Sequence, residues 1–235
     1  MRVLSLLIFC FLLQTIPNSL QAQKVKDIEG SFEALKGQKK VNVFYVYDNM
    51  GVGDFEKEAD YVNKKIKEKN EDEPGTGEEW ARKWVDDREA RFEPKFEELM
   101  TEYLQEHGMV TGRYPNAEYT LIVETTFTEP GFNVGVMRRP AFINLEIKLA
   151  KTSDMKKIVG KCTIKKIPGR DAMGFDFDTG YRLQEAYAKG GKTFAKYLDN
   201  KSPLIKKSYH EILFINPFCC ILYFKYFICP VFWSI

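Results

Sequence analysis

The chain has 235 residues, of which 35 are basic and 33 acidic, and its formal net charge is +2. This balance argues against a nucleic-acid-binding protein, in which a basic excess usually gathers in one region. One densely basic stretch alternates with apolar residues, which indicates the solvated face of a strand. It contains Lys156, Lys157, Lys161, Lys165 and Lys166.

The first 22 residues have the pattern of a secretory signal peptide. Arg2 supplies a positive charge, an apolar run follows from Val3 to Leu13, and Ala22 ends a small-residue cleavage site. The run is shorter than the roughly 20 residues that a membrane span needs. Cys10 lies inside this run, so it does not form a lipoprotein signal. We therefore expect cleavage after Ala22 and export to the periplasm or beyond.

The first predicted strand covers residues 40–48, which read KVNVFYVYD, with apolar side chains on both faces. Asp54 is the predicted N-cap of a helix that runs to Lys69. Residues 71–77 form a loop by composition, because acidic residues, proline and glycine follow one another there.

A second helical pattern begins at Glu78 and carries Trp80 and Trp84. Pro94 interrupts the pattern and starts or kinks a further helix, because a proline fits only the first turn of a helix without strain. Gly108 is the predicted end of that helix.

Three more strands are predicted at residues 118–128, 141–150 and 157–167, and the last two form an antiparallel hairpin. A Gly- and Asp-rich loop covers residues 168–178, and residues 181–198 form a helix. The order is strand, helices, three strands and a C-terminal helix. It predicts a single α+β domain with a mostly antiparallel sheet and helices packed on one face.

The domain is expected to span residues 23–200, because the composition changes at residue 201. Residues 212–235 are dense in Phe, Ile, Tyr and Cys, and Lys225 is their only charge. They could form a membrane segment, a strand pair packed on the domain, or an end that is not native. Pro217 and Pro230 count against the membrane. The third interpretation is favoured, and membrane association is expected only if residues 212–235 are native.

Cysteine and histidine usage predicts no disulfide framework and no metal site. Of the five cysteines, only Cys162 lies in the body of the domain. A disulfide-stapled exported protein would show pairs spread through the fold. His107 and His210 are far apart in sequence, and no Cys/His spacing matches a metal site. No cofactor is expected.

The tripeptide Asp178-Thr179-Gly180 matches the catalytic tripeptide of aspartic proteases. That chemistry needs two carboxylates, whereas the chain has one copy that runs into a helix, so Asp178 or Thr179 is better explained as a helix N-cap. The carboxylates of Asp171, Asp176 and Asp178 could offer oxygens to Ca²⁺, but they lack the EF-hand spacing. A solvated loop is favoured, and no catalytic residue is assigned.

Two regions are candidate binding surfaces. Some of Trp80, Trp84 and Tyr45 would mark a binding patch if they were exposed together. The segment 130–140, PGFNVGVMRRP, joins two strands and combines apolar with basic residues, as partner-binding loops do. A plain extension of the hairpin over the sheet edge is the commoner use of such a loop. The candidate residues in this segment are Phe132, Val136, Met137, Arg138 and Arg139.

Five segments together suggest a family: KVNVFYVYD, AEYTLIVETTF, AFINLEIKL, KKIVGKCTIKK and GFDFDTGYRLQEAYAKGGKTFAKYL. Over residues 39–198 the chain resembles small exported proteins of unknown function from Gram-negative cell envelopes. It is also similar to periplasmic domains related to the TolB N-terminal domain and the CsgG fold. The resemblance is one of pattern, without a signature motif. It implies an accessory or interaction role in the envelope, without defined catalytic residues.

The favoured hypothesis is a non-enzymatic envelope protein that binds another envelope protein or component through a sheet edge or the segment 130–140. One alternative is a small hydrolase that uses the carboxylates of residues 171–178. Another is a carrier of an apolar ligand, with a cavity between the sheet and the helices.

Overall fold

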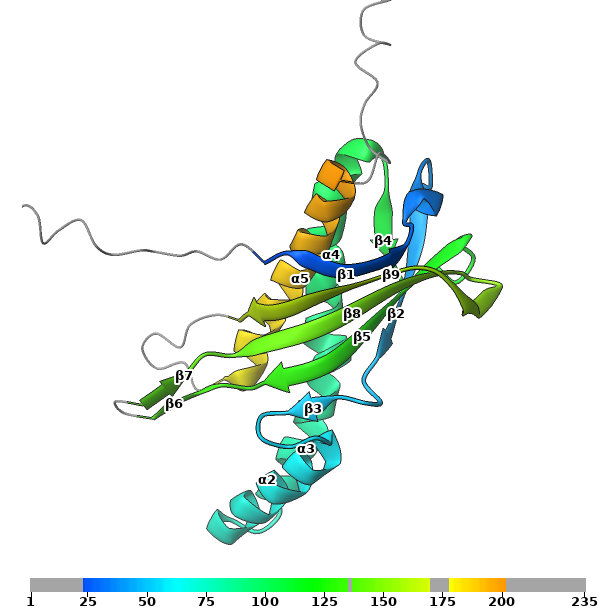
Figure 1. Cartoon of the computed structure of the whole chain (residues 1–235). Coiled ribbons are helices and arrows are strands. Elements are labelled where there is room, and N and C mark those ends of the chain that lie inside the picture. The colour runs from blue at the N-terminus through cyan, green and yellow to red at the C-terminus, as the bar shows by residue number, and fades with distance from the viewer. Residues whose placement is uncertain (1–22, 135–136, 170–177, 202–235) are drawn as a thin grey trace, which may run out of the picture.

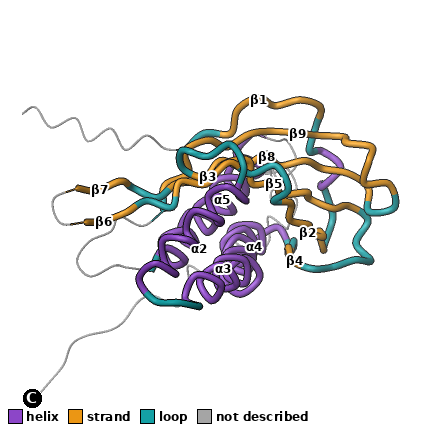
Figure 2. Tube along the Cα trace, turned by 90° about the horizontal axis from the view of Figure 1, so that it is seen from below, coloured by secondary structure: helices purple, strands orange, loops and turns teal. Residues whose placement is uncertain are grey.

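A seven-stranded sheet covered on one face by helices forms the body of the protein (Figures 1 and 2). The computed structural model describes residues 23–134, 137–169 and 178–201, and the side chains of residues 133–138 are outside this description. The predicted α+β class, with a mostly antiparallel sheet, is confirmed. The proposed signal peptide and residues 202–235 lie outside the described residues. None of the described helices is both long and apolar enough to cross a bilayer.

The strands of the sheet follow the order β1-β9-β8-β5-β2-β4, and β3 pairs with β5 beyond the end of β2. The predicted hairpin of β8 and β9 is confirmed. β2 instead runs parallel to both of its neighbours, β4 and β5, so the sheet is mixed. A separate two-stranded ribbon projects beyond the sheet (Figure 1). The strands are β1 (Val25–Gly30), β2 (Lys40–Val46), β3 (Gly51–Val52), β4 (Val110–Gly112), β5 (Tyr119–Glu129), β6 (Phe132–Val134), β7 (Met137–Arg139), β8 (Phe142–Lys151) and β9 (Asp154–Pro168).

The helices include one nearly continuous run made of α3, a π-helical segment and α4. As predicted, Pro94 lies in the first turn of α4, and Gly108 ends the run in the left-handed conformation, with φ of 69°. The prediction for Asp54 is wrong. α2 begins four residues later at Glu58, and Asp54 lies in a turn after β3. The helices are α2 (Glu58–Asp72), α3 (Thr76–Asp87), the π-helical segment (Arg88–Phe92), α4 (Glu93–Leu104) and α5 (Thr179–Lys201), with 3-10 turns at Glu33–Leu35 and Gln105–His107.

Strand β1 was not predicted, because its sequence VKDIEG is mostly polar and does not alternate. β1 is an edge strand that pairs with β9, and a strand of this kind is held by its neighbour's backbone rather than by its own burial. Two lysines of β9 strengthen the pairing: Lys161 Nζ lies 3.1 Å from a Glu29 oxygen, and Lys165 Nζ lies 3.5 Å from an Asp27 oxygen.

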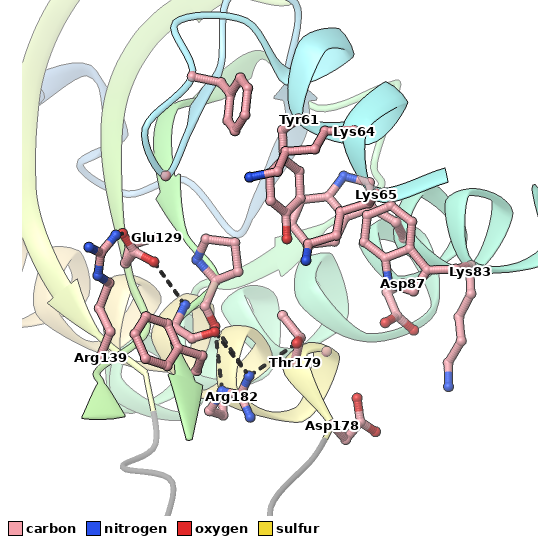
Figure 3. A pocket seen from close by; sticks show the side chains of 18 of the residues that line it. Tyr61, Lys64, Lys65, Lys83, Asp87, Glu129, Arg139, Asp178, Thr179 and Arg182 are labelled. Atoms are coloured by element: carbon pink, nitrogen blue, oxygen red, sulfur yellow. Dashed lines mark hydrogen bonds and ion pairs between the residues drawn. The ribbon is translucent and has the colours of Figure 1, made fainter. Parts of the chain in front are cut away.

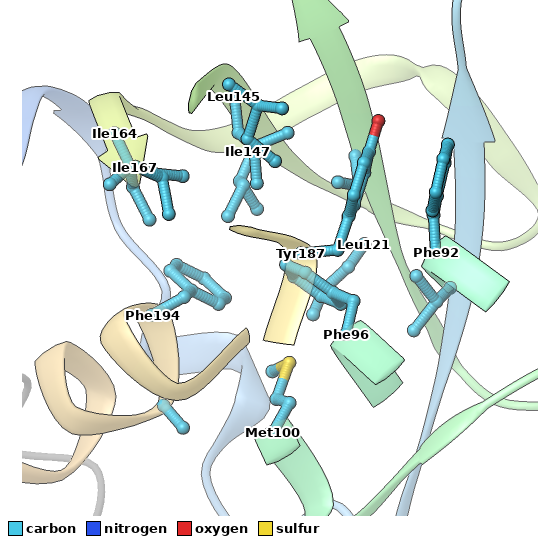
Figure 4. Close-up of a cluster of buried hydrophobic side chains, with 14 of the residues drawn as sticks. Phe92, Phe96, Met100, Leu121, Leu145, Ile147, Ile164, Ile167, Tyr187 and Phe194 are labelled. Atoms are coloured by element: carbon cyan, nitrogen blue, oxygen red, sulfur yellow. The ribbon is translucent and has the colours of Figure 1, made fainter. Parts of the chain in front are cut away.

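The core lies between the sheet and the pair α4–α5 (Figure 4). Phe96 of α4 and Phe194 of α5 are fully buried. Tyr187 of α5 stacks on Phe92 with 5.1 Å between ring centroids, and its hydroxyl lies 2.7 Å from the hydroxyl of Thr125. The buried polar group is therefore satisfied. Large side chains occupy this layer, so the apolar-carrier alternative gains no support from it.

Cys162 of β9 is fully buried, and burial raises the pKa of its thiol to about 12. Only the thiolate is nucleophilic. We therefore expect native protein at pH 8 to leave Cys162 unmodified by iodoacetamide, and denatured protein to be modified fully. Peptide mapping separates this residue from the cysteines of the C-terminal segment. Native labelling at the rate of a free thiol would contradict the prediction.

Candidate functional site

A pocket of about 770 Å³ lies beyond one end of the sheet (Figure 3). Four parts of the fold surround it: helices α2 and α3, the turn after β3, the base of the β6–β7 ribbon, and the first turn of α5. These parts are far apart in the sequence, and their meeting at the sheet end creates the pocket. A volume of this size is in the range of small-molecule sites.

One side of the pocket is an aromatic wall, made of Phe55, Tyr61, Trp80 and Trp84. Trp80 and Trp84 lie one helical turn apart on α3 and stack with 5.6 Å between ring centroids. Tyr61 of α2 contacts both indoles, at 5.9 and 5.4 Å, and Phe55 at 6.0 Å. These contacts join α2 to α3 and hold the rings in a fixed arrangement.

The indole of Trp84 is anchored by a carboxylate. Its Nε1 donates to an oxygen of Glu58 at 2.6 Å, and the Arg88 guanidinium donates to the same oxygen. The Arg88 guanidinium also covers the ring of Tyr47, 4.3 Å from the ring centroid. The aromatic wall is thus tied to the π-helical segment and to Tyr47, which directly follows β2.

Tyr61 brings a hydroxyl to the pocket, where Figure 3 shows it on the same side as the Lys64 and Lys65 side chains. Burial, with a smaller effect of nearby Glu129, raises the pKa of Tyr61 to about 12. The phenol therefore stays protonated at physiological pH. It can donate a hydrogen bond to a ligand.

The opposite side of the pocket is formed by the base of the β6–β7 ribbon. Phe132 is 38% exposed, and the Arg139 guanidinium lies over its ring, 5.6 Å from the centroid. Arg139 Nη1 lies 3.3 Å from a Glu129 oxygen and 3.6 Å from an Asp54 oxygen. The Gly131 N–H donates to the other Glu129 oxygen at 3.1 Å. Arg139 therefore links the ribbon to β5 and to the turn after β3.

Arg182 of α5 forms the floor and is only 4% exposed. Its guanidinium donates to the Pro130 carbonyl at 3.4 Å and to the Thr179 hydroxyl at 3.0 Å (Figure 3). A buried arginine needs such acceptors to offset its lost hydration. The residue fixes the start of α5 against the base of the ribbon.

Arg91 binds two carboxylates at the rim of the pocket. Its Nε lies 3.1 Å from Asp87, and its Nη1 lies 2.8 Å from Asp178. Burial raises the pKa of Asp87. Burial also opposes ionisation of Asp178, but hydrogen bonds from Arg91 and the Tyr181 N–H outweigh it and lower the Asp178 pKa. Asp178 caps α5 through that N–H, at 3.3 Å, as the sequence predicted.

The structure brings the two predicted binding regions to one place, but Trp84 is buried, so the predicted joint exposure of the tryptophans is wrong. Trp80 and Trp84 line the same pocket as Phe132 and Arg139, together with Asp178. Val136, Asp171 and Asp176 lie outside the described residues, as do the side chains of Met137 and Arg138. Within the described ranges, no three His, Cys, Asp or Glu side chains are placed to share a metal ion.

Other lining residues were missed by sequence reasoning. They include Phe55, Tyr61, Lys64, Lys65, Lys69, Lys83, Asp87, Glu129 and Arg182. Lysines are typical of the solvated face of an ordinary helix, so those on α2 and α3 give no signal of a site in the sequence. Glu129 and Arg182 are charged residues buried at element ends, and only the folded arrangement identifies them.

Comparisons with known proteins give a distant similarity of fold. No family model matches the chain, and no curated protein matches it. The structure is similar to that of a PelC dodecamer from Paraburkholderia phytofirmans, with a TM-score of 0.33 and 13% identity, over 71% of this chain and 96% of that one. It is also similar to protein XCC0632 from Xanthomonas campestris, described as DUF330, with a TM-score of 0.32 and 8% identity, over 68% and 83% of the two chains. The resemblance to TolB and CsgG domains stays a prediction.

Proposed function

We propose that this chain is an exported, non-enzymatic binding domain that holds its ligand in the pocket beside the aromatic wall. One observation carries the proposal. Trp80 and Trp84 on one side, and Phe132 and Arg139 on the other, meet around the same pocket although about 50 residues separate them in sequence. Aromatic residues and arginine are the types enriched where binding energy concentrates.

The pairing of the carboxylates favours binding over catalysis. Arg91 holds Asp87 and Asp178, and Arg139 holds Glu129. A general acid or base works best with a pKa near the operating pH. The pKa of Asp178 is moved away from that range, which argues against a hydrolase that depends on this residue.

Export is proposed from the first 22 residues, and it places the ligand in the cell envelope or outside the cell. A component of the envelope, either a protein or a small molecule, is therefore the expected kind of partner. The size of the pocket favours a small molecule or one group of a larger one.

The experiment is ligand retention. Mature protein is incubated with the small-molecule fraction of an envelope extract, washed and denatured, and the released molecules are measured by mass spectrometry. We expect Trp80→Ala to reduce the retained ligand about tenfold, since loss of one aromatic anchor costs over 1 kcal/mol. Phe44→Ala is the control, because Phe44 is 50% exposed and lies on β2, outside the pocket.

Retention that Trp80→Ala leaves unchanged would contradict the proposal. Chemical conversion of the retained molecule by wild-type protein would favour the hydrolase instead.

A further inference from the structure

The pocket carries more positive than negative charge. Its lining contains six cationic side chains and four carboxylates, an excess of two. The cations are Lys64, Lys65, Lys69, Lys83, Arg139 and Arg182, and the carboxylates are Asp54, Asp87, Glu129 and Asp178. The whole chain has a net charge of only +2, so this excess is concentrated in one place.

Each carboxylate of the lining has an arginine partner within 4 Å, and two carboxylates share each guanidinium. Asp54 and Glu129 share Arg139, and Asp87 and Asp178 share Arg91. A carboxylate held in this way has little capacity left for a cationic ligand or for the hydroxyl groups of a neutral one. The acidic residues of the lining thus stabilise the pocket through ion pairs and do not bind the ligand.

The lysines of the lining, in contrast, have few carboxylate partners. Lys64 and Lys65 share the single carboxylate of Glu68, at 3.6 and 2.8 Å. Lys69 and Lys83 form no ion pair with any residue that the structure describes. Ammonium groups that share or lack a counter-charge near a hollow surface favour a ligand that supplies one.

The geometry places these cations beside the aromatic wall. Lys64 Nζ lies over the Phe55 ring, 5.5 Å from its centroid, and Lys65 follows it on α2 (Figure 3). The Tyr61 hydroxyl faces the same region and makes no hydrogen bond with a described residue. One patch therefore offers two ammonium groups, a hydrogen-bond donor and flat apolar surface.

We infer that the ligand of this pocket is a ring-bearing organic anion, whose charged group meets Lys64, Lys65 and the Tyr61 hydroxyl while its ring lies against the aromatic wall. This inference rests on the proposed binding function and specifies the class of ligand. Lysine is a point charge without the planar fork of arginine, so carboxylate, sulfate and phosphate groups all fit the same patch.

The test compares two fluorescent probes that differ by one charged group. Anilinonaphthalene sulfonate carries a ring system and a sulfonate, and N-phenyl-naphthylamine carries the ring system alone. We expect the full-length mature protein to bind the sulfonate about tenfold more tightly, a difference worth about 1.4 kcal/mol. The difference should shrink as salt is raised, because the Debye length falls from about 10 Å at 0.1 M to about 3 Å at 1 M.

A pair of double variants locates the charged group. Lys64→Gln with Lys65→Gln should weaken sulfonate binding about tenfold and leave binding of the neutral probe unchanged, a loss worth about 1.4 kcal/mol. Lys67→Gln with Lys156→Gln is the control, because it removes the same charge from two exposed positions outside the pocket. Equal binding of the two probes, or equal effects of the two double variants, would overturn the inference.

Competition experiments show which anionic group the pocket prefers. Benzoate, phenyl sulfate and phenyl phosphate carry one ring and three different anionic groups, and displacement of the sulfonate probe by each ranks them.

The retention experiment separates this inference from the proposed function. A neutral or cationic molecule retained through Trp80 would refute the anion and leave the binding function intact, whereas no Trp80-dependent retention would refute the binding function.

Discussion

Replacing Gly191 with valine is expected to lower the free energy of unfolding by about 3 kcal/mol. Gly191 lies in α5, where a Cβ would overlap the backbone carbonyl oxygen of Phe96 on α4. A backbone atom cannot turn aside as a side chain can, so α4 and α5 would have to separate. That separation would open the contact on which the core between helices and sheet depends.

Gly190→Ala is the matched control for this substitution. A Cβ at Gly190 would meet Leu145 Cδ1 at 2.9 Å and Ile167 Cδ1 at 3.5 Å, which are the ends of flexible side chains. Alanine also gains about 1 kcal/mol of helix propensity over glycine. We therefore expect a change close to zero for Gly190→Ala. Urea unfolding followed by circular dichroism measures both, and equal midpoints for the two variants would refute the close helix contact.

Trp84→Ala should cost about 4 kcal/mol of stability and abolish ligand binding. Trp84 is only 7% exposed, packs against Tyr61 and Trp80, and donates to Glu58. Its removal leaves a cavity between α2 and α3 and takes one hydrogen bond from the Glu58 carboxylate. Because Tyr61 and Trp80 pack against this indole, its removal is expected to displace the rings that the ligand contacts.

Val85→Ala separates the role of Trp84 from a general effect on α3. Val85 follows Trp84 directly, but it is 50% exposed, so its truncation should change stability by less than about 0.5 kcal/mol. Urea unfolding gives the stabilities, and hydrogen exchange of the α2 amides shows whether the helix pair loosens. Protection of α2 that survives Trp84→Ala would argue against the anchoring role.

The long elements could be predicted because their own residues show which face is buried. β5, β8 and α5 carry apolar residues at the spacings of a strand or a helix, and the structure has them within three residues of the predicted bounds. Pro94, Gly108 and Asp178 were interpreted correctly as helix-end residues, since their effect is local. Glycines inside a helix normally weaken it, and α5 contains two in succession. The structure shows that Gly191 permits close contact with α4.

The short edge elements could not be predicted in the same way. β1, β3 and β4 have six, two and three residues, and their hydrogen bonds depend on a neighbouring strand. The Asp54 prediction failed for a related reason. Its side chain pairs with Arg139, a residue 85 positions away, rather than with the next helix.

The sequence by itself determined the balanced charge, the α+β order of elements and the two candidate binding regions around Trp84 and Phe132, because these follow from composition and local spacing. Tertiary structure alone decided that the two regions share one pocket, and that lysines from α2 and α3 surround it. Spacing along the chain reports which side chains share a face of one element. It carries no information about which faces of distant elements meet, since that depends on how the whole core packs.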